Sequence, residues 1–150
     1  LVIAGDGNKK TELQELTREL KLQKYVTFTG FIAHEDISSF YEMCDAIVLP
    51  SIWNEPLSRV LLETLHFGKP VIATKTGGTP EIIRDGENGL LIEPKNAEQL
   101  ADKILFLYKN PDVCKRIQEK AKSYSIKNLN SRALTKKFVN MYETVLSKRD

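Results

Sequence analysis

The chain has 150 residues, 41% hydrophobic and 28% charged, which is ordinary for a globular domain long enough to bury a core. Its net charge of +2 is too small to indicate binding to nucleic acid or to an anionic membrane. No apolar run approaches the length of a membrane span, and we expect no signal peptide. Two isolated cysteines, Cys44 and Cys114, fit no zinc-site spacing, so we expect reduced residues in or near the core.

Short strand-like runs alternate with helical patterns along the first two thirds of the chain. Apolar or β-branched runs predict strands at residues 1–4, 26–29, 46–49, 70–74 and 90–92. Helical spacing predicts helices at about residues 13–22, 37–44, 58–67 and 79–84. The first, third and fourth runs lack polar alternation, as expected of parallel strands covered on both faces. We therefore predict an α/β fold, a Rossmann-like doubly wound parallel sheet in three α/β/α layers.

The last third of the chain is predicted to be helical. Asn96 is expected to cap one helix, with Gln99 as its reciprocal partner. Asn110 and Pro111 predict a second start, a cap followed by proline at the first helical position. A last helix is expected from residue 130 or 131. Its apolar stripe comprises Leu134, Phe138, Tyr142, Val145 and Leu146.

The turn from Glu55 to Arg59 leads from a predicted strand into a predicted helix. The first N–H groups of a helix lack intrahelical partners and the dipole is positive there, so this place suits a phosphate. Ser58 is the expected N-cap. Glu63 lies about 7–8 Å further along the helix axis. A diphosphate at the helix start would leave room for a sugar near Glu55 and a ribose near Glu63, since carboxylates accept strong hydrogen bonds from hydroxyls.

Glu55 and Glu63 form an E-x7-E motif, which GKPVIA at residues 68–73 and GGTPE at residues 77–81 follow. This set resembles the C-terminal domain of the retaining glycosyltransferases of family 4, also called group 1, which have the two-domain GT-B fold. The likeness covers about residues 1–110. It includes the turn at residues 85–89 and extends back to Gly30, Asp45, Pro50 and Ser51.

The resemblance implies transfer of a hexosyl group from a nucleotide-diphosphate sugar to a sugar, lipid or other hydroxyl acceptor. It implies that Glu55 is catalytic and contacts the donor sugar, and that Glu63 binds the ribose hydroxyls. The substrate-binding residues that it implies further are Leu57, Ser58 and Arg59 at the distal phosphate, Phe31 and Ile32 against the base, and Gly77 and Gly78, where backbone approaches the cleft closely.

The chain departs from the family pattern after Glu55. Many members have an aromatic residue, glycine and leucine there, whereas this chain has Pro56-Leu57-Ser58-Arg59. Ser58 adds a Cβ where phosphate is expected to approach, and Arg59 is a candidate for an additional phosphate partner.

The resemblance also implies what surrounds the chain. Residues 1–150 are expected to form a donor-binding domain without its first strand–loop–helix unit, which carries a basic diphosphate ligand, and without the N-terminal acceptor domain. The chain begins without Met, which also suggests a piece of a longer protein. No metal, other cofactor or nucleic acid is expected. The expected location is the cytoplasm, with peripheral attachment of the full enzyme to the inner face of a membrane left open.

Several alternatives remain at this point. Glu63 can instead be the i,i+4 partner of Arg59 on a solvated helix face. Trp53 can stack on a ligand or be buried. We expect His34 and His66 to be structural. The chain can also belong to another GT-B enzyme, such as a sugar-phosphate synthase or phosphorylase, or be a non-enzymatic nucleotide-binding module.

Overall fold

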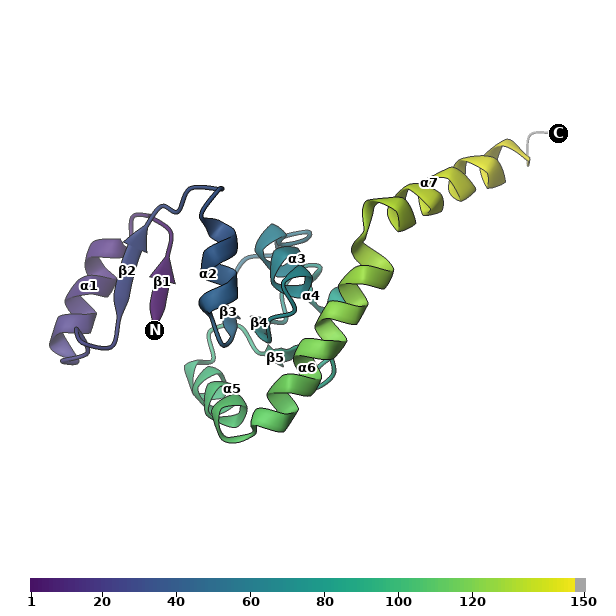
Figure 1. Cartoon of the computed structure of the whole chain (residues 1–150). Helices are drawn as coiled ribbons and strands as arrows, with labels where there is room; N and C mark the ends of the chain where they lie inside the picture. Colours follow the sequence, from purple (N-terminus) through teal and green to yellow (C-terminus); the bar gives the residue numbers. More distant parts are fainter. Residues whose placement is uncertain (148–150) are drawn as a thin grey trace. The chain divides into compact units, whose positions relative to one another are not determined.

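The computed structural model describes residues Leu1–Ser147, except for the side chain of Ala133. The chain divides into two compact units, Leu1–Glu42 and the part from Met43 onward (Figure 1). Both units are built from parallel strands joined by helices, which confirms the predicted α/β, Rossmann-like class. One difference is that the ladders form two sheets, β1-β2 in the first unit and β3-β4-β5 in the second.

The first unit contains one β–α–β segment and most of a second helix. Its elements are β1 (Val2–Ala4), α1 (Lys10–Glu19), β2 (Thr27–Gly30) and α2 (Ile37–Met43), the last ending at the boundary. The predicted leucine stripe of α1, which includes Leu13 and Leu16, is exposed, and the helix has no buried residue. The first unit therefore buries little apolar surface by itself.

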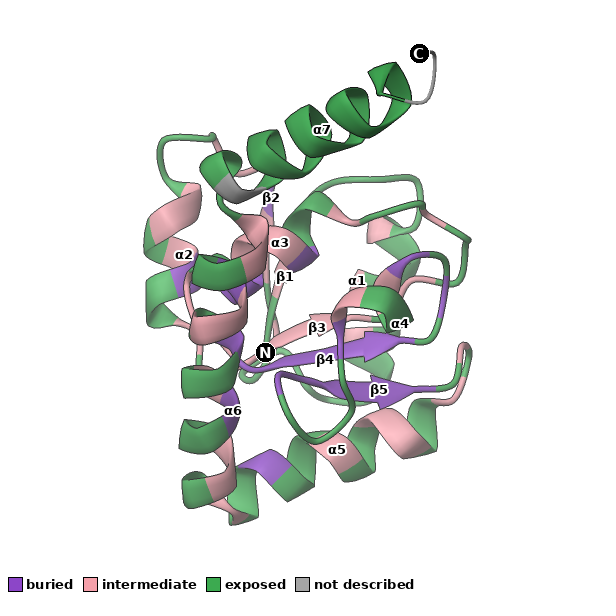
Figure 2. Ribbon diagram, turned by 90° about the vertical axis from the view of Figure 1, so that its right-hand side faces the viewer, coloured by how far each residue is buried: buried purple, intermediate pink, exposed green. Residues whose placement is uncertain are grey.

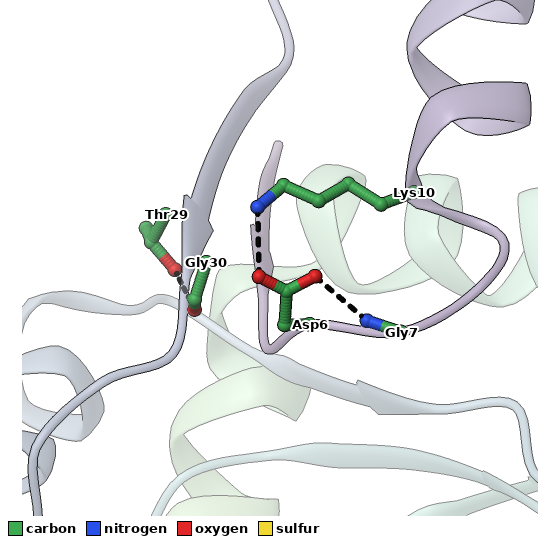
Figure 3. A network of polar contacts seen from close by, with 5 residues as sticks. All are labelled: Asp6, Gly7, Lys10, Thr29 and Gly30. Carbon is green, nitrogen blue, oxygen red and sulfur yellow. Dashed lines mark hydrogen bonds and ion pairs between the residues drawn. The ribbon is translucent and has the colours of Figure 1, made fainter.

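The turn after β1 is held by a small polar network (Figure 3). The Asp6 carboxylate accepts hydrogen bonds from the Gly7 amide at 2.9 Å and from Lys10 Nζ at 3.0 Å, which connects the turn to the start of α1. The Gly5 amide donates to the Gly30 carbonyl at 2.8 Å. The bond from Lys10, helped by the Gly7 amide, holds the pKa of Asp6 below its ordinary value of 3.8.

The second unit has a three-stranded parallel sheet with β4 in the centre. Its first elements are β3 (Ile47–Leu49), α3 (Arg59–His66), β4 (Val71–Thr74), α4 (Thr79–Ile82) and β5 (Leu90–Ile92). Ile72 in β4 lies opposite Val48 on one side and Leu90 on the other. The helices α5 (Ala97–Lys109) and α6 (Pro111–Tyr124), the π-helical segment η1 (Ser125–Leu129) and α7 (Ser131–Leu146) follow.

Both faces of this sheet are covered, and its strands are apolar except for Thr74 at the end of β4. On one face Val71 and Ala73 pack with Leu61 and Leu65 of α3 and with Ala121 of α6. On the other face lie Ile72, Leu90, Ile92, Leu107 of α5 and Ile117 of α6. Figure 2 shows β4 and β5 buried along their length. The second unit is therefore a three-layer α/β/α structure in which α6 serves both faces.

Two of the predicted caps differ from those in the structure. Asn96 Oδ1 accepts from the Gln99 amide at 2.9 Å, as predicted, but Gln99 Oε1 accepts from the Glu93 amide at 2.8 Å. The reciprocal bond from Gln99 to Asn96 was therefore wrong. Helix α6 begins at Pro111 with Asn110 at the N-cap position, as predicted, but the Asn110 side chain makes no capping bond, and its Nδ2 donates to the Phe106 carbonyl at 2.8 Å.

The structure also locates the cysteines and the last helix. Cys44 and Cys114 are free and half-buried, as predicted, and burial raises the pKa of the Cys114 thiol. The helix α7 begins at Ser131, follows η1 and extends away from α6 (Figure 1). Its five stripe residues are between 40% and 64% exposed. Within the described residues, no helix combines the length and apolar character needed to cross a membrane.

Candidate functional site

The start of α3 presents free backbone donors. Ser58 has an extended conformation, and its Oγ accepts from the Leu61 amide at 3.4 Å, so the predicted N-cap is confirmed. The next turn begins with the bond from the Leu62 amide to the Ser58 carbonyl at 3.2 Å. In the part of the chain that the structure describes, the amides of Arg59 and Val60 have no acceptor. These two donors and the helix dipole make the end of α3 suited to an anion.

Glu63 lies further along the same helix and is half-buried. Its Oε1 accepts from Arg59 Nε at 3.2 Å, so the i,i+4 pair considered from the sequence is present. The Glu63 side chain is 27% exposed and that of Arg59 is 77% exposed. An exposed pair of this kind contributes about 0–1 kcal/mol. A carboxylate has about four acceptor positions, of which the bond from Arg59 uses one.

Glu55 belongs to a loop that forms hydrogen bonds with the segment after β4. The Glu55 carbonyl accepts from the Gly78 amide at 3.1 Å, and the Glu55 amide donates to the Trp53 carbonyl at 3.0 Å. The Gly77 amide points at Asn54 Oδ1 at 3.4 Å, and the Thr74 hydroxyl donates to a carbonyl at the start of the loop. The Glu55 carboxylate forms no ion pair with any described residue. The backbone of Glu55 is thus fixed while its carboxylate is left for a ligand.

Gly77 and Gly78 lie directly against this loop. A Cβ on Gly77 would stand 2.7 Å from the Glu55 carbonyl carbon and still closer to its oxygen. A Cβ on Gly78 would overlap the Pro56 carbonyl oxygen. Gly77 is exposed and Gly78 is buried. The close backbone approach expected at these glycines is therefore made by the chain's own Glu55–Pro56 segment.

The remaining predicted residues fall in both units. Leu57 and Arg59 are exposed at the start of α3. Phe31, which is 83% exposed, and the half-buried Ile32 belong to the first unit. Of the two alternatives for Trp53, burial is wrong, because this side chain is 65% exposed.

Sequence reasoning did not identify the loop anchors Asn54 and Thr74. Both bonds span more than twenty positions, from Thr74 to Ser51 and from Gly77 to Asn54. A polar residue at the end of an apolar strand was the only sequence signal for Thr74, and an asparagine in a loop has many other uses.

The predicted site residues line neither of two hollows in the described part of the chain. One, of about 200 Å³, lies at the carboxyl ends of the second sheet, beside Pro50, Thr74 and Ile92. The other, of about 540 Å³, is an open hollow beside Phe67, Gly68 and α6. Among the residues described, no three His, Cys, Asp or Glu side chains gather as metal ligands do.

Comparison with known proteins identifies the family that this chain resembles. The family model described as glycosyl transferases group 1 matches residues 1–124. The alpha-D-kanosaminyltransferase of Streptomyces kanamyceticus is 35% identical over 120 residues, which are 80% of this chain and 31% of that protein.

Solved structures agree with this family. Anabaena HepE in complex with UDP-glucose has a TM-score of 0.85 at 28% identity, over 95% of this chain and 40% of that one. Sucrose-phosphate synthase from Thermosynechococcus elongatus has a TM-score of 0.83 at 27% identity, over 99% of this chain and 38% of that one.

The match is extensive along this chain and partial along its relatives. The chain spans about a third of the length of the curated relatives, from 27% to 41%. The family model, in contrast, covers most of the chain, including Glu55, Glu63 and the two glycines. The chain therefore belongs to the group 1 glycosyl transferases, and its fold is that of one Rossmann-like domain of a GT-B protein.

Proposed function

We propose that this chain is the donor-binding half of a retaining glycosyltransferase of family 4. The full protein moves a hexosyl group from a nucleotide-diphosphate sugar to a hydroxyl acceptor. The observation that carries the proposal is the start of α3, where unpaired amides lie between Glu55 and Glu63 in one short stretch of chain. The complex of the similar HepE with UDP-glucose supports a donor of this kind.

The proposed roles follow from what each group offers. The dipole and the free amides at the start of α3, together with the backbone of Leu57, Ser58 and Arg59, bind the distal phosphate. Glu63 accepts from the ribose hydroxyls, and Glu55 is the catalytic carboxylate that contacts the hexose. In the first unit, Phe31 and Ile32 supply apolar surface for the base. These backbone and basic donors offset the diphosphate charge without a metal. The proposed location of the protein is the cytoplasm.

We further propose that the full protein supplies a strand–loop–helix unit and an N-terminal acceptor domain. A doubly wound sheet has the strand order 3-2-1-4-5-6. The described residues form two strands in the first unit and three in the second, one strand fewer than that order contains. The half-exposed β3 supports this, since the other strands of its sheet are buried.

A second candidate is a sugar-phosphate synthase, which the likeness to sucrose-phosphate synthase favours. Such an enzyme uses the same kind of donor and differs in its acceptor, a phosphorylated sugar. Comparing free and phosphorylated sugars as acceptors of the full protein distinguishes the two candidates.

Calorimetry with a panel of UDP-, GDP- and ADP-sugars tests donor binding by this chain. The expected result is saturable binding of at least one donor and competition by the matching nucleoside diphosphate. Glu81→Gln is the control, because Glu81 is exposed in α4 and has no assigned role in donor binding. Failure of every nucleotide sugar to bind a folded chain contradicts the proposal.

A further inference from the structure

The loop that carries Glu55 has its backbone pressed onto two glycines of another segment. The Gly78 amide donates to the Glu55 carbonyl at 3.1 Å, which places the β4–α4 turn directly beneath the loop. The Cβ of any other residue at position 77 would stand 2.9 Å from the Glu55 amide nitrogen and 2.7 Å from its carbonyl carbon. Both distances are below 3.0 Å, so something must shift.

The two glycines exclude a side chain for different reasons. Gly77 has φ +49, a left-handed conformation, and also lacks space. Gly78 has φ −79, which any residue adopts, so only the Pro56 carbonyl excludes a side chain there. The obstacles are backbone atoms, which cannot rotate away as the end of a flexible side chain does.

From these contacts we infer that Gly77 and Gly78 are positioning residues, which set the place of the Glu55 carboxylate through the backbone of its loop. This inference rests on the proposed function, in which Glu55 contacts the donor hexose. A methyl group at either position moves the loop by about 1 Å, and a displacement of that size commonly reduces activity by about 100-fold. The helix α3 is held separately by buried Leu61 and Leu65, so the amides of Arg59 and Val60 and the Glu63 carboxylate stay near their places.

Three single variants separate the possible causes. Gly78→Ala adds a Cβ against the loop without strain in φ. Gly77→Ala adds a Cβ against the loop and also strain in φ. Gly86→Ala is the matched control, since Gly86 has φ +77 but nothing within 4 Å of its Cβ position. Any loss that comes from φ strain alone therefore appears in the control as well.

Binding of the nucleoside diphosphate and of its sugar conjugate gives the first measurement. We expect Gly78→Ala and Gly77→Ala to weaken the conjugate about 10- to 100-fold and the diphosphate less than about threefold, and Gly86→Ala to change neither. In a Glu55→Ala background, Gly78→Ala should cause little further loss, because both changes remove one contact. Equal losses of the two ligands, or full additivity with Glu55→Ala, overturn the inference.

Trp53 gives a second measurement that needs no ligand. It is the chain's one tryptophan and lies in the same loop, bonded through its carbonyl to the Glu55 amide. We expect acrylamide quenching of its fluorescence to change in Gly77→Ala and Gly78→Ala but not in Gly86→Ala. Unchanged quenching in both loop-facing variants refutes the positioning role. Changed quenching in a chain whose wild type binds no nucleotide sugar supports that role and contradicts the proposed function instead.

Discussion

Ser58 stabilises the start of α3 and at the same time reduces the number of free amides there. Its hydroxyl satisfies the Leu61 amide, which leaves the amides of Arg59 and Val60 as the free donors at the start of α3. Replacing an N-cap serine by alanine costs about 1 kcal/mol. The Cβ that seemed a departure from the family pattern therefore belongs to a side chain that stabilises the helix at the proposed phosphate site.

Asp6 gives a residue-scale prediction for the first unit. Its carboxylate is bonded by Lys10 and Gly7, so its pKa in the folded chain lies below 3.8. The bonds of the Asp6 carboxylate therefore stabilise the folded chain above pH 3.8. This stabilisation is lost as the pH falls through the lower pKa of Asp6 in the folded chain. Carboxyl carbon NMR should show this depressed pKa, and Lys10→Gln should return it toward 3.8. A pKa for Asp6 that is unchanged in Lys10→Gln would contradict the network in Figure 3.

At the scale of elements, α7 differs from the rest of the second unit. Its stripe, from Leu134 to Leu146, is exposed, whereas β4 is buried (Figure 2). Few buried contacts mean a low free energy of local opening. We therefore predict that amides of α7 exchange with solvent faster than those of Ile47–Leu49 in β3. Equally slow exchange of both segments, in a chain shown to be monomeric, would contradict this prediction.

Local sequence patterns predicted the strands and the α-helices well, because each has a pattern in its own residues, whereas the π-helical segment Ser125–Leu129 was not predicted. Residues Leu90–Ile92 form a strand as predicted, and Ser58 caps α3 as predicted. The errors concern choices among several partners. Gln99 follows both Glu93 and Asn96 within a few residues, and the sequence does not say from which of the two amides its side chain accepts.

The candidate site was only partly predictable for a related reason. Glu55, Ser58 and Glu63 lie within nine residues, so the turn and the helix period place them in one loop–helix segment. The support of its loop comes from Thr74, Gly77 and Gly78, about twenty residues away, through contacts that depend on the tertiary fold. Glycines announce a close approach, but not which backbone approaches.

At the scale of the whole molecule, the chain should bind donor without transferring sugar. The proposed reaction needs an acceptor domain as a second wall of the cleft, and the chain spans about a third of its curated relatives. We expect no detectable transfer of sugar by this chain to simple hydroxyl acceptors or to water. Product formation is monitored by chromatography of a labelled donor. A rate of product formation above that of Glu55→Ala would contradict the proposal that transfer needs the acceptor domain.

The most direct test of donor binding compares two variants and two ligands by calorimetry. Glu63→Ala should weaken both the nucleoside diphosphate and its sugar conjugate, whereas Glu55→Ala should weaken only the conjugate. Each loss should be about 1.5–3 kcal/mol, or about 10- to 100-fold in affinity, as for a hydrogen bond to a charged group. If Glu63 serves only as the partner of Arg59 and Glu55 is only a solvated loop residue, both variants bind both ligands as the wild type does. That result, or equal losses of both ligands in Glu55→Ala, would contradict the assigned roles.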